Sequence, residues 1–136
     1  MANDEIHVVV GTDADIVSAR QKGRALAAKL GFSPTELAMI ATAISELARN
    51  IVLYAKQGEI VLRSEGRPGK QGIVVVARDE GPGIRDTEQA MQAGYSTSGS
   101  LGLGLAGVRR LMDDFEIESR LGWGTVVTAK KWNRWV

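Results

Sequence analysis

The sequence of 136 residues contains no cysteine, a single histidine and only 5% aromatic residues. The lack of cysteine excludes a disulfide framework, thiolate metal sites and a cysteine nucleophile. The lone His7 has no second ligand candidate at a metal-binding spacing and no Gly-x-Ser-x-Gly partner, so a serine hydrolase triad is excluded too. We therefore expect His7 to serve packing or to lie at the surface.

The sequence has no large excess of charge of either sign, since it contains 17 Lys and Arg residues and 16 Asp and Glu residues. Such a balance gives no electrostatic footprint for nucleic acid or for an anionic membrane. No apolar run approaches the roughly 20 residues of a membrane span, and the acidic segment 1–5 lacks the apolar core of a signal peptide. We therefore expect a cytoplasmic protein with a small-molecule or protein partner, no nucleic acid and no membrane.

Apolar periodicity and capping signals predict one α/β domain over residues 1–136. The clearest helix start is Ser33-Pro34-Thr35-Glu36, a capping box with proline at the first helical position. A polar segment at 85–100 is expected to form a lid, and turns are expected at 66–70 and 120–124. The predicted strands are 5–10, 59–63, 72–78, 115–119 and 125–130, and the predicted helices are 13–30, 34–55 and 104–112. This order implies a two-layer sandwich with helices on one face of a mixed sheet.

Two polar residues, Glu46 and Asn50, stand four apart in the apolar helix predicted at 34–55. They lie off the apolar stripe of that helix, whose segment 37–45 carries no charge, so the second face of the helix is expected to line a cavity. A carboxylate and an amide one turn apart face the same way and can share one magnesium-phosphate centre. Either residue alone would more often be an ordinary surface residue.

Two glycine-containing motifs follow, Asp79-Glu80-Gly81-Pro82-Gly83-Ile84 and Gly102-Leu103-Gly104. The first places a carboxylate at a strand end and, through its glycines, backbone without side chains, which together can contact the flat ring of a ligand. Alone, this motif would be an ordinary turn. The second opens a helix, whose unpaired N–H groups and positive dipole end suit a phosphate chain. Segment 102–107 also matches the dinucleotide fingerprint, but a polar loop precedes it instead of a strand, which argues against that function. The order and spacing of these motifs indicate a nucleotide site.

These residues resemble the four sequence boxes of the GHKL superfamily of gyrase, heat-shock chaperone, histidine kinase and mismatch-repair ATPases. Glu46-x-x-x-Asn50 resembles the N box, and Asp79-x-Gly81-x-Gly83-Ile84 resembles the G1 box. Gly102-x-Gly104 and Gly124-Thr125 resemble the G2 and G3 boxes, so the resemblance covers nearly the whole chain. It implies the GHKL, or Bergerat, ATP-binding fold, with a mixed but mostly antiparallel sheet and helices on one face.

Within the superfamily, the short lid and the lack of an appended domain resemble the small serine kinases of bacterial partner-switching systems. Segment 93–113 is most similar to the switch kinases of stressosomes. The resemblance implies an ATP- and Mg²⁺-dependent serine/threonine protein kinase that phosphorylates STAS-domain antagonist and scaffold proteins. Once released by phosphorylation, it would activate a downstream PP2C-type phosphatase or similar output protein.

Two alternatives stay open, an anti-sigma-factor kinase that binds a sigma factor and a nucleotide-sensing binding module without transferase activity. Anti-sigma relatives usually follow the boxed asparagine with a His-Ala-Tyr-like segment, whereas here Asn50 leads to Ile-Val-Leu-Tyr-Ala at 51–55. The tryptophans fit either core and edge cover or a protein-contact surface. They are Trp123, Trp132 and Trp135.

The resemblance also implies residue roles. Glu46 would orient and partly deprotonate the attacking serine hydroxyl, and Asn50 would ligate Mg²⁺ through its amide oxygen. Asp79 would accept a hydrogen bond from the adenine amino group, with Thr125 near the base and the amides of 102–104 at the phosphates. The implied cofactor-binding residues are Asn50, Asp79, Gly81, Gly83, Ile84, Gly102, Leu103, Gly104 and Thr125.

Overall fold

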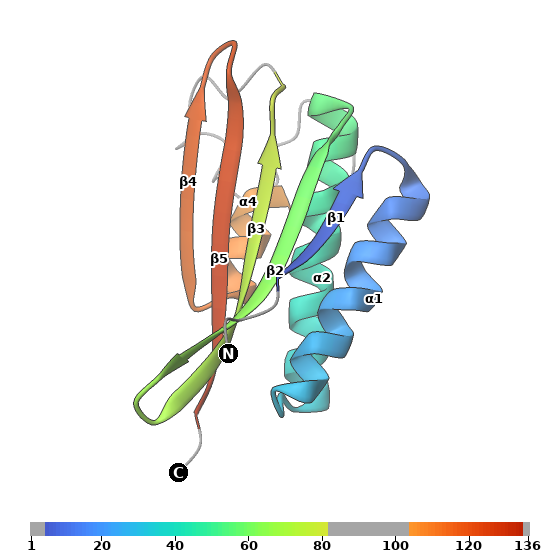
Figure 1. Ribbon diagram of the computed structural model, residues 1–136. Coiled ribbons are helices and arrows are strands. Elements are labelled where there is room, and N and C mark those ends of the chain that lie inside the picture. The colour runs from blue at the N-terminus through green and yellow to red at the C-terminus, as the bar shows by residue number, and fades with distance from the viewer. Residues whose placement is uncertain (1–4, 82–103, 135–136) are drawn as a thin grey trace.

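The computed structural model describes residues 5–81 and 104–134, which form a five-stranded sheet with helices packed on one of its faces (Figure 1). The strands follow the spatial order β1-β2-β3-β5-β4, and each of the four pairings is antiparallel. Their bounds are β1 Ile6–Val10, β2 Gly58–Arg67, β3 Lys70–Asp79, β4 Asp114–Arg120 and β5 Gly124–Arg134. The expected two-layer α/β class is confirmed, and the sheet, expected to be mixed, is antiparallel throughout the described strands.

The hairpin between β2 and β3 is longer than the sequence predicts. We expected a turn over 66–70, but Gly66 and Arg67 still pair with Gln71 and Lys70, which leaves Pro68 and Gly69 as the turn. Strand β5 likewise runs four residues beyond its predicted end at residue 130. Trp132 supports the added length through cation–π contacts. Cζ of Arg67 lies 5.6 Å and Nζ of Lys70 lies 4.3 Å from the centroid of its ring.

The two tryptophans within the described residues differ in their surroundings. Trp132 is 8% exposed and donates its indole N–H to Asp114 at 2.8 Å, so it covers the sheet where β5 lengthens. Trp123 is 75% exposed at the turn between β4 and β5. Trp135 lies outside the described residues.

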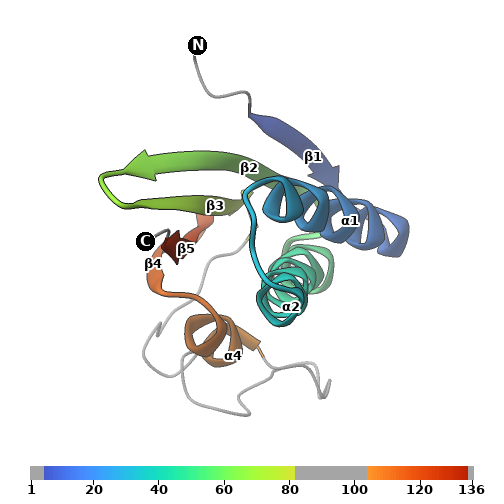
Figure 2. The same cartoon turned by 90° about the horizontal axis from the view of Figure 1, so that it is seen from below.

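In the described part of the chain, three α-helices cover one face of the sheet, as the view along the layers shows (Figure 2). They are α1 Asp13–Lys29, α2 Pro34–Asn50 and α4 Gly104–Leu111. Helix α2 begins with the predicted capping box, in which Ser33 Oγ accepts the N–H of Glu36 and the Glu36 carboxylate accepts the N–H of Ser33. Helix α1 begins with an equivalent box between Thr12 and Asp15.

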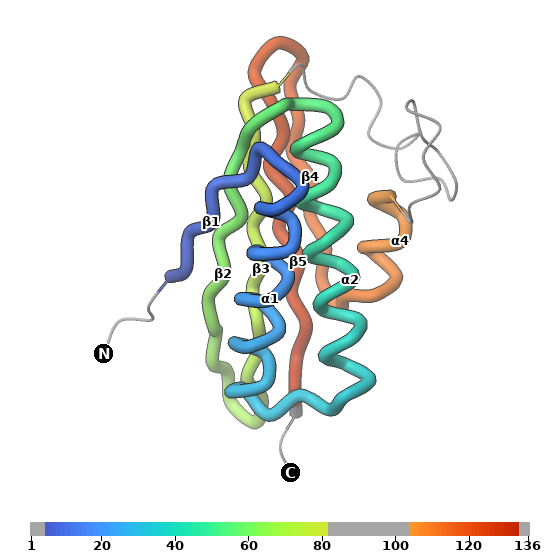
Figure 3. Tube along the Cα trace, turned by 90° about the vertical axis from the view of Figure 1, so that its right-hand side faces the viewer, coloured from blue at the N-terminus to red at the C-terminus, as the bar shows by residue number. Residues whose placement is uncertain are grey.

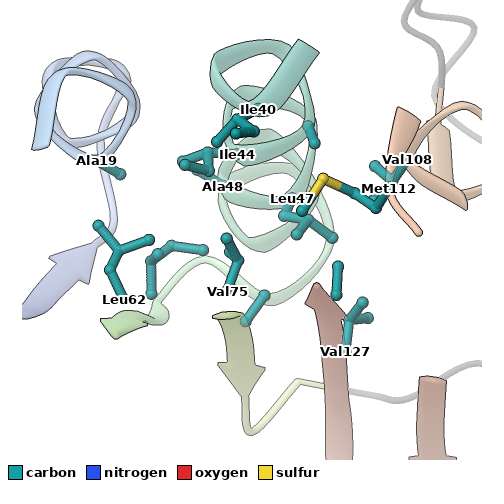
Figure 4. Packing of buried hydrophobic residues seen from close by; sticks show 14 of the residues in the cluster. Ala19, Ile40, Ile44, Leu47, Ala48, Leu62, Val75, Val108, Met112 and Val127 are labelled. Atoms are coloured by element: carbon teal, nitrogen blue, oxygen red, sulfur yellow. The ribbon is translucent and has the colours of Figure 1, made fainter. Parts of the chain in front are cut away.

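The core lies beneath α2, which packs between α1 and α4 and over β2, β3 and β5 (Figure 4). The apolar stripe predicted for this helix is fully buried at Ile40 and Ile44, and Leu47 is 1% exposed. Val108 of α4 and Met112, directly after this helix, close the same core. On the other face of the sheet a small second cluster contains Val61, Val74 and Val76.

The helical segment Pro34–Ala55 is long and apolar enough to cross a membrane by length and composition, with a mean hydropathy of 1.3. Half of its most apolar stretch is buried inside the protein. Because that stretch contains the residues that form the core, packing against the sheet accounts for its apolar composition.

The end of this segment differs from the regular helix predicted to residue 55. Helix α2 ends at Asn50, and Ile51–Ala55 continue as a π-helix, η1, before Lys56 takes a φ of +69°. A π-helix holds a wider turn than an α-helix and frequently occurs at functional sites. It begins here directly after one of the two residues of the predicted N box.

Candidate functional site

Asp79 is the last residue of β3 and lies between Gly58 of β2 and Thr125 of β5 in the sheet register. One oxygen of its half-buried carboxylate, Oδ1, accepts the N–H of Gly81 at 2.9 Å. Among the described residues no donor is bonded to Oδ2, so this oxygen is available to a ligand amino group. The geometry suits the predicted adenine contact.

Three glycines allow the backbone segments around Asp79 to come together. A Cβ on Gly81 would lie 2.6 Å from the Cβ of Ala55 at the end of η1. A Cβ on Gly58 would lie 2.9 Å from Ile51, and one on Gly124, where φ is +127°, would strike the Asp79 carbonyl. Of these glycines, Gly58 was not identified from the sequence. Its role arises from pairing with β3, which a single glycine before a strand does not reveal.

Thr125 is 9% exposed, and its hydroxyl is fixed by Ser119 of the neighbouring strand β4. The two oxygens are 2.8 Å apart, and Ser119 Oγ also donates to the Gly124 carbonyl at 3.2 Å. The register therefore brings the predicted G3 threonine directly opposite Asp79, as a residue near the base requires. Ser119 was missed by the sequence analysis, and only the pairing of β4 with β5 identifies it.

Glu46 is 8% exposed and points from α2 toward the beginning of α4. Its Oε1 accepts the backbone N–H of Gly104 at 3.2 Å, across 58 positions of sequence. Its Oε2 lies 3.6 Å from Nη1 of Arg49, one turn further along α2. The second face of α2 is thus occupied by α4 near Glu46, and the carboxylate sits at the positive end of that helix.

Asn50 is partly exposed at the junction of α2 and η1, and its side chain caps no backbone N–H of the π-helix. Within residues 5–81 and 104–134, no group of three or more His, Cys, Asp or Glu side chains could hold a metal ion. A magnesium ion at Asn50 would therefore depend on phosphate oxygens and water for most of its ligands. This fits Mg²⁺, which usually binds through one or two protein groups together with substrate phosphates.

The predicted site residues gather at one end of the molecule. In Figure 3 the end of β3, the turn between β4 and β5 and the last turns of α2 lie at this end, with α4 beside α2. The G2 box is represented by Gly104, the first residue of α4. The lid predicted at 85–100 lies outside the described residues, as do Gly83, Ile84, Gly102 and Leu103.

An open groove of about 680 Å³ also reaches Asp79, but from the sheet face that the helices leave uncovered. Besides Asp79, its lining includes Val9, Glu59, Arg78 and Val126 together with Ala55 and Gly58, and among the described residues it contains neither Glu46 nor Gly104. This groove therefore shares Asp79 and its close neighbours with the adenine end of the candidate site, and its described lining does not reach Glu46 or the beginning of α4.

The histidine kinase-like ATPase domain family matches residues 9–131 of the chain. The serine/threonine-protein kinase RsbT of Bacillus subtilis is 52% identical over 132 residues, which cover 97% of this chain and 99% of that protein. The anti-sigma F factor of Caldanaerobacter subterraneus is 38% identical over 84% of this chain and 82% of that protein.

Two solved structures share the fold. The mycobacterial sensor histidine kinase MprB superposes with a TM-score of 0.55 at 13% identity, over 99% of this chain and all of that chain. The catalytic domain of histidine kinase ThkA gives a TM-score of 0.53 at 19% identity, over 96% of this chain and 95% of that chain. At this level of identity the likeness concerns the fold alone. With the sequence relatives and the assembled boxes, it leads to one conclusion: the chain belongs to the histidine kinase-like ATPase family and, within it, to the RsbT-like serine/threonine-protein kinases.

Proposed function

We propose that this kinase transfers the γ-phosphate of ATP to a serine or threonine of STAS-domain antagonist and scaffold proteins in a stressosome. The observation that carries the proposal is the buried Glu46 carboxylate at the beginning of α4, next to an amide of the predicted phosphate-binding box. A carboxylate beside bound phosphates is well placed for the proton of an attacking hydroxyl. Phosphoryl transfer otherwise depends mainly on positioning and charge stabilisation.

In the proposed reaction the partner's hydroxyl oxygen forms a bond to the γ-phosphorus while the bond to the bridging oxygen of ADP breaks. The hydroxyl proton passes to the Glu46 carboxylate, and ADP leaves. Asp79 and Thr125 hold the base, and the N–H of Gly104 donates to a phosphate oxygen. Magnesium, bound through Asn50 and the phosphates, would neutralise the charge of the phosphate chain. The same assignment gives Gly81, Gly83 and Ile84 to the base and Gly102 and Leu103 to the phosphates.

The partners follow the same proposal. Phosphorylation of the STAS protein would release the kinase to bind and activate a PP2C-type phosphatase or a similar output protein in the cytoplasm. The 38% identity to an anti-sigma F factor makes an anti-sigma-factor kinase the second candidate. Co-purification with a sigma subunit would favour that candidate, and phosphorylation of STAS proteins alone would favour the first.

The direct test is incubation of the protein with labelled ATP, Mg²⁺ and the STAS proteins encoded beside it. We expect label on a serine or threonine of a STAS protein. Tight binding of Mg-ATP without labelling of any of these proteins would instead identify a nucleotide-sensing module without transferase activity.

Calorimetry on Asp79→Asn tests the adenine contact separately. The substitution removes a charged acceptor whose hydrogen bond is worth about 1.5–3 kcal/mol, so the ATP dissociation constant should rise by about 10- to 150-fold. The circular dichroism spectrum should be unchanged. An unaltered dissociation constant would remove Asp79 from the site.

A further inference from the structure

Arg49 lies next to the site, and neither the sequence motifs nor the resemblance assigns it a role. It follows Glu46 by three positions on α2, and its side chain is 44% exposed, whereas that of Glu46 is 10% exposed. Within the described residues it is the only cation within 4.0 Å of the Glu46 carboxylate. The second group bonded to this carboxylate is the N–H of Gly104.

Two anions compete as hydrogen-bond acceptors for the N–H of Gly104. In the structure it donates to Oε1 of Glu46 at 3.2 Å, and in the proposed function it donates to a phosphate of ATP. A single N–H makes one strong hydrogen bond, and two anions at this separation repel each other. Phosphate binding therefore takes the N–H away from Glu46.

Glu46 then becomes a buried carboxylate that has lost a donor. An ionised group in that position is strongly disfavoured unless an opposite charge stays with it. Arg49 contacts the other oxygen, Oε2, so that contact does not compete with the phosphate. The guanidinium of Arg49, being partly exposed, is also free to follow the carboxylate as it moves.

We propose that Arg49 is a positioning residue, which holds the Glu46 carboxylate in the site after ATP has taken the N–H of Gly104. This inference rests on the proposed function of the site. It has two consequences: Arg49 offsets the repulsion between Glu46 and the incoming phosphates, and it keeps the carboxylate oriented for the hydroxyl proton. Both consequences act through Glu46.

A double-mutant cycle measured by ATP calorimetry tests the first consequence. Arg49→Met in the wild-type protein should raise the ATP dissociation constant by about 3- to 10-fold, the range expected of directly coupled groups. In a Glu46→Gln background, where no carboxylate charge is present, the same substitution should change the dissociation constant by less than about twofold. Arg49→Lys keeps the positive charge and should recover most of the affinity.

Arg24→Met on α1 is the matched control, because Arg24 is an exposed helical arginine with no ion pair among the described residues. It should leave the ATP dissociation constant unchanged. Melting temperatures of all variants are compared with this control. If Arg49→Met proves less stable than Arg24→Met, the cycle is repeated with Arg49→Gln, which keeps a polar side chain at the exposed position.

Single-turnover transfer at saturating ATP tests the second consequence. Arg49→Met should lower the rate in the wild-type protein by about 3- to 30-fold and leave the residual rate of Glu46→Gln unchanged. Equal losses in both backgrounds would overturn the proposal, because Arg49 would then act on the nucleotide, the partner or the fold directly. No loss in either background would overturn it as well.

The two arms separate this inference from the proposed function. Calorimetry requires no protein partner, so the coupling between Arg49 and Glu46 is measured even if no phosphate is transferred. Failure of the wild-type protein to label any STAS protein would contradict the kinase assignment alone. Additive effects on ATP binding would contradict the role of Arg49 alone.

Discussion

The two ends of helix α4 are held in different ways. At its beginning, one described hydrogen bond joins the N–H of Gly104 to the Glu46 side chain. Three hydrogen bonds join the other end to strand β5. Lys131 Nζ donates to the Leu111 carbonyl at 2.9 Å, and Asp113, which follows the helix, makes the other two. Its N–H donates to the Lys130 carbonyl at 2.8 Å, and its carboxylate accepts the N–H of Trp132 at 2.7 Å.

Both ends obey the same electrostatics, with a carboxylate at the positive end of the helix and a lysine at the negative end. They differ in what can replace the contact. Lys131 is 7% exposed, and its partner is a main-chain carbonyl that belongs to the fold. Glu46 holds an N–H that a phosphate could take instead. We therefore expect the first turn of α4 to serve catalysis and the last turn to serve stability, and mutations should separate the two.

The largest effect is expected from Glu46→Gln at the first end. The amide keeps an oxygen that can accept the Gly104 N–H, but it cannot take the hydroxyl proton, so transfer should fall by about 10²–10⁴-fold. Single-turnover labelling of a STAS protein measures the rate, and thermal melting should show little change. Transfer at a near wild-type rate would remove Glu46 as the base.

Asn50→Ala should have the next largest effect, and unlike Glu46→Gln it should impair nucleotide binding. The substitution removes the proposed protein oxygen ligand of Mg²⁺, so both Mg-ATP affinity and turnover should fall by about 10- to 100-fold. Calorimetry with and without Mg²⁺ checks the assignment. If ATP binding without Mg²⁺ is weakened equally, Asn50 acts on the nucleotide or the fold and not through the metal.

At the opposite end, Lys131→Met should lower the free energy of unfolding without changing the chemistry. The partly buried carbonyl of Leu111 loses a charged donor, which costs about 1–3 kcal/mol. Urea denaturation measures this loss, and the fully folded variant should transfer phosphate at a wild-type rate. A large loss of transfer with unchanged stability would show that both ends of α4 serve the reaction.

Lys130→Met is the matched comparison one residue away, and it should have the smallest effect. Lys130 lies on the uncovered face, where its Nζ is 3.2 Å from Glu65. A pair that is partly accessible to water contributes about 0–1 kcal/mol. A loss as large as that of Lys131→Met would show that burial is not what distinguishes these two lysines.

The contribution of this pair should also depend on pH. Burial acts to raise the pKa of Glu65, but Lys130 and Arg67 outweigh it and hold the pKa below its ordinary value of 4.5. Because the pKa is lower in the folded state, the pair stabilises the protein fully above that value and loses its effect as the pH falls through the folded-state pKa. The stability difference between wild type and Lys130→Met should therefore shrink in acid.

Local signals predicted the parts of the fold that depend on neighbouring residues. Ser33 and Glu36 marked the start of α2 because both partners of a capping box lie within one turn. Asp79 was correctly placed at the end of a strand. The π-helix was missed, because the apolar segment 51–55 fits an α-helix equally well, and its close approach to Gly58 and Gly81 is not visible in the local sequence.

Contacts between segments that are distant in the sequence could not be predicted from local signals. Glu46 was singled out from the sequence, but its bond to Gly104 depends on how α4 docks against α2. The role of Ser119 likewise depends on the register between β4 and β5, which sets it beside Thr125. The roles of the individual site residues stay predictions that the substitutions above will decide.

Among the described strands β4 is the last of the sheet, and the charges on this edge have a consequence for the protein at high concentration. Its residues alternate between half-buried side chains and exposed ones, and the exposed set consists of Asp114, Glu116, Glu118 and Arg120. An open edge offers unpaired backbone groups to the edge of another molecule, which is a route to aggregation. When two copies approach through β4, each brings three carboxylates and one guanidinium, so the net charges of the two edges are both negative and repel. This excess of negative charge therefore works against edge-to-edge association through β4.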